Sequence, residues 1–134
     1  MKTIKTLLLV LLPIISFCQT SDVENTIYDE INNYKKKQNN SLVLNQELSS
    51  ASRKHSILMQ ETNELEHDYS IYEEEIVQRT NNVNRTNSDV AKVVLNNFLN
   101  SPSHKEIIEN KHHKIGVGVV IDNLGYVWVT IRFS

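Results

Sequence analysis

Three side chains that can transfer a proton or bind a metal occur in two short segments of this sequence. His67 and Glu74 lie seven residues apart in LEHDYSIYEEEI, and His104 lies in SPSHKEII. An imidazole and a carboxylate can act as acid and base or as ligands of a divalent cation. Two histidines and one carboxylate leave a fourth position open, as in a catalytic zinc site. We therefore predict that His67, Glu74 and His104 line one cleft, which can hold a divalent metal such as zinc.

A second interpretation of these three residues stays open. Their spacing is irregular, and the sequence contains no HExxH-type helix motif. Exposed polar side chains are often only solvated, so the three residues could instead be separate surface groups. His55 falls on the inner face of an expected helix and is interpreted as a core histidine bonded to the backbone rather than as a ligand.

The first half of the chain indicates two helices. Between residues 22 and 37, apolar residues recur every three or four positions, which predicts a helix with one apolar face. Asp22 can cap this helix, and the lysines at 35–37 suit its negative C-terminal end. Asn45 is placed to cap a second helix that runs to about Thr62. We expect the inner face of this second helix to comprise Leu48, Ala51, Ser52, His55, Leu58 and Met59.

The middle of the chain predicts one strand and two further helices. Residues 74–79 have the alternating pattern of a short strand. Residues 89–100 repeat apolar positions with helical spacing. A shorter helix over 103–109 follows Ser101 and Pro102, which are typical of a helix start.

The chain ends in a predicted β-hairpin, with strands at 115–121 and 126–133. Gly116 and Gly118 lie on one face of the first strand, where they leave room for another backbone or side chain to approach. Together the elements predict a small antiparallel sheet covered by helices, an α+β architecture.

The N-terminus has the pattern of a secretory signal. Lys2 and Lys5 precede an apolar run that is shorter than the roughly 20 residues of a membrane span. We expect cleavage after Cys18, which leaves residues 19–134 as one exported domain, periplasmic or extracellular, without a thiol. The alternative is a lipoprotein tethered through Cys18, although Phe17 stands where a small residue normally precedes a lipid-modified cysteine.

The predicted mature chain is mildly acidic. Removing residues 1–18 takes two lysines from the 14 basic residues and leaves the 16 acidic ones, a net charge of −4. Neutralising phosphates takes a stripe of clustered lysine and arginine, whereas the one basic cluster here, residues 35–37, is interpreted as a helix end. We therefore expect no nucleic-acid partner.

Four segments, in order over residues 22–133, resemble the bacterial branch of the CAP superfamily, which includes cysteine-rich secretory and pathogenesis-related proteins. The segment 42–59 resembles the family's pattern of leucines, small residues, a histidine and a methionine. LEHDYSIYEEEI resembles the plant-type stretch of the family, in which a histidine precedes a Gly-Glu-Asn motif, and His67 and Glu74 match it. FLNSPSHKEII resembles the bacterial Ser-Pro-Gly-His motif, and IGVGVVIDNLGYVWVTIRF resembles the closing hairpin.

The resemblance implies a secreted three-layer α-β-α sandwich (SCP-like domain) whose central cleft contains His67, Glu74 and His104. The chain also departs from the family pattern. Glu73 and Glu75 stand where the family has glycine and asparagine, and the family's disulfides have no counterpart.

The resemblance implies no single reaction, because family members are linked to lipid, sterol and metal binding. We expect a non-catalytic binding domain for a small molecule, a lipid or a cell-envelope component. The predicted mature chain has no cysteine and no G-x-S-x-G motif, and Ser101 and Ser103 are interpreted as helix-capping residues. The alternative is a metal-assisted hydrolase, in which His67 and His104 hold zinc and Glu74 is a third ligand or the general base.

Overall fold

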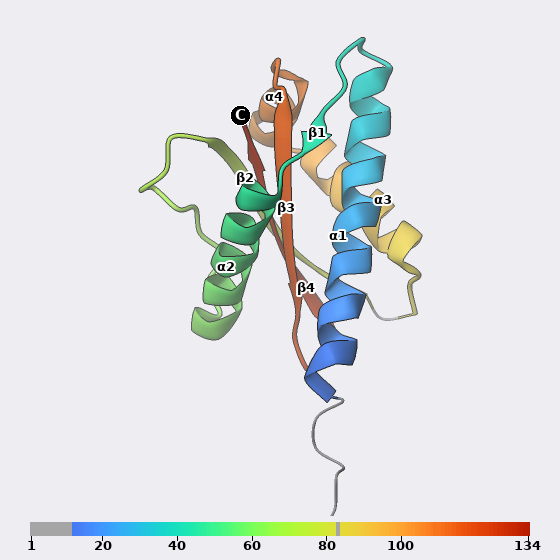
Figure 1. The fold of residues 1–134 in the computed structure, drawn as a ribbon, viewed down its shortest axis with the longest axis vertical. Coiled ribbons are helices and arrows are strands. Elements are labelled where there is room, and N and C mark those ends of the chain that lie inside the picture. The colour runs from blue at the N-terminus through green and yellow to red at the C-terminus, as the bar shows by residue number, and fades with distance from the viewer. Residues whose placement is uncertain (1–11, 83) are drawn as a thin grey trace, which may run out of the picture.

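A small sheet separates two layers of helices in the computed structural model, which describes residues 12–82 and 84–134 (Figure 1). Helices α1 and α3 lie on one side of the sheet, α2 lies on the other, and α4 lies near one end. This arrangement confirms the α-β-α sandwich. The elements are α1 (Leu12–Lys36), β1 (Val43–Leu44), α2 (Gln46–Thr62), β2 (Glu74–Asn81), α3 (Asn87–Leu99), α4 (Pro102–Glu109), β3 (Lys114–Ile121) and β4 (Tyr126–Phe133).

The predicted C-terminal hairpin forms the centre of the sheet. The strand order is β1-β3-β4-β2, and β4 is antiparallel to both of its neighbours. Strand β1 runs parallel to β3, so the sheet is mixed rather than wholly antiparallel as predicted. A two-residue strand carries too little pattern to be recognised, because alternation needs at least four residues to show.

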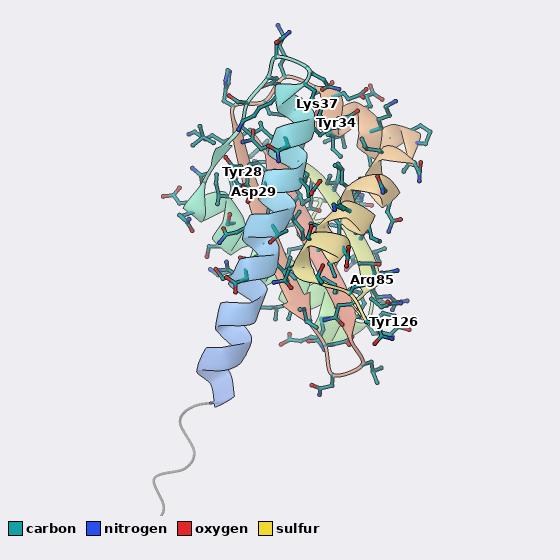
Figure 2. The ribbon with its side chains drawn as sticks, turned by 90° about the vertical axis from the view of Figure 1, so that its right-hand side faces the viewer. Tyr28, Asp29, Tyr34, Lys37, Arg85 and Tyr126 are labelled. Atoms are coloured by element: carbon teal, nitrogen blue, oxygen red, sulfur yellow. The ribbon has the colours of Figure 1, made fainter. Side chains whose placement is uncertain are left out.

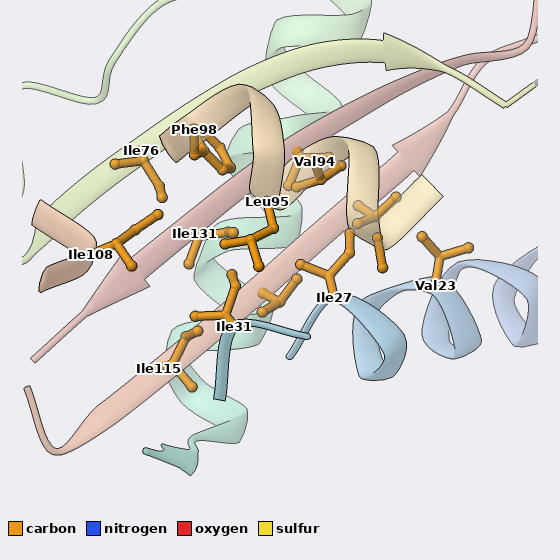
Figure 3. Packing of buried hydrophobic residues seen from close by; sticks show 14 of the residues in the cluster. Val23, Ile27, Ile31, Ile76, Val94, Leu95, Phe98, Ile108, Ile115 and Ile131 are labelled. Carbon is orange, nitrogen blue, oxygen red and sulfur yellow. The ribbon is translucent and has the colours of Figure 1, made fainter. Parts of the chain in front are cut away.

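The larger hydrophobic core lies between the sheet and helices α1 and α3 (Figure 3). Ile27 and Ile31 of α1, Val94 and Phe98 of α3, and Ile131 of β4 all belong to it, each at most 1% exposed. The apolar face predicted for residues 22–37 is therefore confirmed. Burial of each such side chain contributes about 1.5–3 kcal/mol relative to leaving it in water.

Helix α1 begins at Leu12, so Asp22 lies inside the helix and does not cap it as predicted. Residues 1–11, the first part of the predicted signal segment 1–18, lie outside the described residues. Within the part of the chain that the structure describes, no helix has both the length and the apolar character needed to cross a membrane.

The C-terminal end of α1 is attached to α4 by a buried lysine. Lys35 is 0% exposed, and its ammonium donates to the carbonyl oxygens of Ile108 and Asn110 at 2.6 Å each. Burial lowers the pKa of Lys35. The neighbouring Tyr34 donates its hydroxyl to the carboxylate of Glu109 at 2.6 Å, again joining α1 to α4 (Figure 2). The lysine run ends α1 as predicted, but its first member satisfies carbonyl groups of a different helix.

Helices α3 and α4 begin with the residue types expected at helix starts. Thr86 caps α3 through a capping box with Asp89, so this helix begins at Asn87, slightly before the predicted start. Ser101 is the N-cap of α4 and Pro102 its first residue, as predicted. The Ser101 side chain makes no capping hydrogen bond and lies 3.5 Å from the hydroxyl of Ser103.

Helix α2 packs directly on β3 because two glycines leave space for its backbone. A Cβ atom on Gly118 would overlap the backbone of Ser52 and Arg53, and one on Gly116 would overlap the backbone of Leu48. The hydroxyl of Ser56 donates to the Gly118 carbonyl at 2.9 Å. The close approach predicted for the two glycines is confirmed.

This close approach also determines which face of α2 is buried. Asn45 caps the helix and Thr62 ends it, both as predicted. The predicted inner face is wrong in part, because Leu58 is 48% exposed and small serines take the inner positions. A helix backbone lying against glycine leaves little depth for large side chains. The buried residues are Ser49, Ser52, His55, Ser56 and Met59.

We expect Gly118→Ala to destabilise the protein by about 1–3 kcal/mol, because the added methyl group would overlap the backbone of α2. Urea unfolding followed by circular dichroism measures this change. Ser50→Ala on the exposed side of α2 is the control and should change the free energy of unfolding by less than about 0.5 kcal/mol. Equal stability of both variants would contradict the close packing of α2 on β3.

Candidate functional site

Strand β2 places two adjacent glutamates on opposite faces of the sheet. Glu74 lies opposite Phe133 of β4, and Glu75 lies opposite Arg132. Successive side chains of a strand point to opposite faces, so Glu75 faces α2 while Glu74 faces the side of α3 and α4. The end of the sheet therefore carries two separate carboxylate clusters.

The first cluster is built around Glu75, whose side chain is 4% exposed. One carboxylate oxygen lies 2.9 Å from Nε of Arg132. The other oxygen accepts the backbone N–H of Asp68 at 2.9 Å and lies 3.3 Å from Nδ1 of His67. Glu75 thus joins β4 to the segment 63–73, which links α2 to β2.

Two further contacts fix this segment. Arg132 also donates to the carboxylate of Asp68 at 3.1 Å. Hydrogen bonds from Ser70 lower the pKa of Asp68, and the charge of Arg132 lowers it further. Nε2 of His55 lies 2.8 Å from the carbonyl oxygen of Glu66, which confirms that His55 is a buried histidine bonded to the backbone.

His67 and His104, two of the three predicted site residues, lie next to each other. Their ring centroids are 6.4 Å apart with an interplanar angle of 52°. His104 comes from the first turn of α4, and its ring meets the ring of Phe98 edge to face at 5.3 Å. The His67 side chain is 38% exposed, so the pair is open to solvent at His67.

Glu74, the third predicted residue, has different partners. Its two carboxylate oxygens accept the side-chain amide of Asn110 at 3.2 and 3.3 Å, and one of them lies 3.1 Å from Nε2 of His112. The ring of His112 stacks on Phe133 at 4.7 Å. The carboxylate that contacts His67 is that of Glu75, the next residue of the strand.

The described side chains do not form a set of three zinc ligands. Among residues 12–82 and 84–134, no group of three or more His, Cys, Asp or Glu side chains is arranged to hold a metal ion. Glu74 would have to leave Asn110 and His112 to join His67 and His104. Zinc binding therefore stays a prediction.

Sequence reasoning missed Glu75, Arg132 and His112. The alternation of β2 assigns Glu74 and Glu75 to different faces, but the sequence does not say which face the histidines occupy. Arg132 becomes the partner of Glu75 only through the β2–β4 register, and His112 meets Glu74 only because α4 folds back beside β2. These are contacts between residues far apart in the sequence, which carry no local pattern.

The family model for the cysteine-rich secretory protein family, CAP, matches residues 28–133. The chain belongs to the CAP family. A search of curated protein sequences gave no significant match.

Three solved structures share the fold of this chain. An outer surface protein of Borrelia burgdorferi superposes with a TM-score of 0.71 at 22% identity, covering 86% of this chain and 94% of that one. An extracellular protein of Bacillus anthracis that contains an SCP domain gives 0.70 at 18% identity, covering 92% and 44%. Hookworm platelet inhibitor gives 0.58 at 16%, covering 84% and 69%. At these identities the likeness establishes the fold of this CAP domain and not its ligand.

The environment of His104 keeps its imidazole uncharged. Burial lowers the pKa of His104 below its ordinary value of 6.5, and the charge of His67 lowers it further. At neutral pH His104 is therefore a neutral ring, with one nitrogen that donates a hydrogen bond and one that accepts.

We expect the imidazole of His104 to titrate below pH 6.5 in the folded protein and closer to 6.5 in His67→Ala. Because the folded-state pKa is depressed, the contribution of neutral His104 to stability is fully present above the unfolded pKa and is lost as the pH falls. NMR titration of the histidine ring protons measures both midpoints. A His104 midpoint at or above 6.5, or one unchanged by His67→Ala, would show that the two rings are not neighbours.

Proposed function

We propose that the chain is an exported, non-catalytic CAP binding domain whose ligand contacts the His67–His104 pair. The ligand would be a small molecule, a lipid or a component of the cell envelope. The observation that carries this proposal is the pair itself: two imidazoles from distant segments, 6.4 Å apart and open to solvent at His67.

The surroundings of the pair support a binding role because they fix the geometry before any ligand arrives. Glu75 and Asp68 attach the segment 63–73 to the sheet through Arg132, and Phe98 supports the ring of His104. A ligand that meets groups already held in place loses less conformational entropy on binding.

Exposed apolar groups near the pair support the same interpretation. Tyr69 is 88% exposed, and its ring lies 6.2 Å from that of His67. Leu65 and Tyr72, in the same segment, are 53% and 104% exposed. Tyrosines of this kind are enriched where proteins bind partners, because the ring offers both apolar area and a hydroxyl.

The proposal of a non-catalytic role rests on the chemistry of the side chains. The described contacts of His104 are with the rings of His67 and Phe98, and Ser101 and Ser103 contact each other at the start of α4. A serine nucleophile needs a base within hydrogen-bond reach, which these contacts do not supply.

Export is proposed from the signal-like N-terminus and from the similar structures. Residues 1–18 have the charge and apolar pattern of a secretory signal. Two of the similar structures are an outer surface protein and an extracellular protein.

We expect the protein to bind either vesicles of phosphatidylethanolamine and phosphatidylglycerol or purified peptidoglycan in a sedimentation assay. His67→Ala and His104→Ala should each weaken this binding by about tenfold, the loss of one or two contacts of roughly 1 kcal/mol. His113→Ala, an exposed histidine in the turn before β3, is the matched control and should bind like the wild type.

If the wild type and the three variants all bind equally, the His67–His104 pair is not part of the binding site. Turnover of an ester or peptide library that disappears in Glu74→Ala would instead establish the hydrolase alternative.

Zinc at the pair is tested separately by calorimetric titration of metal-free protein. If His67 and His104 are ligands, His67→Ala should bind zinc at least about tenfold more weakly than the wild type, because the variant lacks one of the two histidine ligands. Equal affinity in both proteins would show that zinc does not bind at this pair.

A further inference from the structure

A pocket of about 630 Å³ that is widely open to solvent, called the cavity below, lies at the end of the sheet on the face opposite Glu75. Glu74, Asn110, His112 and Phe133 line it, together with Tyr72 and Glu73 from the segment that precedes β2. Its volume falls within the range of about 300–1,000 Å³ that is typical of small-molecule sites. His67 and His104 do not line this cavity, so it is distinct from the proposed CAP ligand site.

The carboxylate of Glu74 is held in a fixed orientation at the wall of this cavity. Both of its oxygens accept from the amide of Asn110, and Nε2 of His112 lies 3.1 Å from one of them. Nε2 also lies 2.8 Å from the carbonyl oxygen of Ile107. Because a carbonyl oxygen can only accept, Nε2 carries a hydrogen and donates it to the Ile107 carbonyl, while the Glu74 oxygen lies beside this N–H group.

This arrangement leaves Glu74 able to bind a further donor. The Glu74 side chain is still 44% exposed, and a carboxylate has about four lone-pair positions. Lys35 holds Asn110 in place by donating to its carbonyl oxygen at 2.6 Å. The bonded oxygen belongs to the backbone, so the buried end of α1 holds the backbone that carries the Asn110 side chain.

Aromatic rings form the remaining parts of the site. His112 is 7% exposed and stacks on Phe133 with an interplanar angle of 25°. Tyr72 also lines the cavity and is 104% exposed. Because His112 and Phe133 are almost fully buried, the Tyr72 ring is the aromatic surface that a flat ligand can contact here.

The charge of the lining favours a cation. Glu73 and Glu74 contribute two carboxylates, and Lys111 contributes one ammonium. Glu73 makes no hydrogen bond or ion pair within the described part of the chain, so its charge is available. A carboxylate pair beside tyrosine matches a planar cation, which can donate to the carboxylates while its face meets the ring.

We propose that this cavity binds a planar organic cation of the amidine or guanidine class, either as a free small molecule or as the arginine side chain of a peptide. The cation donates to the carboxylates of Glu74 and Glu73, and the Tyr72 ring covers it. This proposal does not depend on the function assigned to the His67–His104 pair.

Calorimetric titration with benzamidine tests the proposal, and the neutral isostere benzamide is the matched ligand control. We expect benzamidine to bind at least about tenfold more tightly than benzamide, since charge-assisted hydrogen bonds are the stronger kind. Glu74→Gln, which keeps the shape of the side chain, should lower the benzamidine affinity about tenfold. Glu61→Gln, an exposed glutamate of α2 that does not line the cavity, should leave it unchanged.

Two further measurements distinguish this cavity from the cluster around Glu75 and His67 and identify the source of the cation. His67→Ala should bind benzamidine like the wild type, even if it has lost binding to vesicles or peptidoglycan. Tighter binding of acetyl-Gly-Arg-Gly-amide than of benzamidine would assign the site to peptides, and the reverse order would assign it to free small cations. Equal affinity for benzamidine and benzamide, or a folded Glu74→Gln protein with wild-type affinity, would overturn the proposal.

Discussion

The buried pair of Glu75 and Arg132 is the interaction on which the site end of this CAP domain depends. The two residues are direct cross-strand partners in β2 and β4, and their side chains are 4% and 6% exposed. Removing one partner of such a pair leaves an uncompensated buried charge, at a cost of about 3–5 kcal/mol. Here both charges are fully occupied: the carboxylate also accepts the Asp68 amide, and the guanidinium also binds the Asp68 carboxylate. These contacts hold the segment 63–73, and His67 with it, against the sheet.

The rest of the molecule supports this pair from both faces of the sheet. On one face, α2 lies against Gly116 and Gly118 of β3, which brings His55 to within 3.8 Å of the Glu75 carboxylate. On the other face, α1 and α3 bury the larger core, which includes Ile76 of β2 and Phe133 of β4. Because both faces of the sheet are packed, the ends of β2 and β4 are held firmly. The polar clusters at these ends are therefore held in place as well.

Two clusters of histidine and carboxylate at the same sheet end give this chain more binding chemistry than one predicted triad. His67 lies beside His104 and Glu75 in one cluster, and Glu74 lies beside His112 in another; we propose each cluster as a ligand site. The proposed functions divide accordingly: an envelope or small-molecule ligand at the pair of imidazoles, and an organic cation at the fixed carboxylate. Substitution of family glycine and asparagine by Glu73 and Glu75 adds charge to both faces, and the structure gives each charge a distinct environment.

Much of the fold was determined by local pattern in the sequence alone. Apolar spacing predicted the buried face of α1, and Asn45 and Pro102 marked helix starts. Alternation predicted the hairpin, and its two glycines predicted the close approach of another segment, which the structure shows to be α2. These features depend on residues that are close together in the sequence, so the sequence carries them directly.

The tertiary structure decided which charged groups meet. Arg132 reaches Glu75 across 57 residues of chain, and the amide of Asn110 reaches Glu74 across 36. The strand register and the position of α4 beside β2 determine these two contacts, and no periodic pattern in the sequence encodes them.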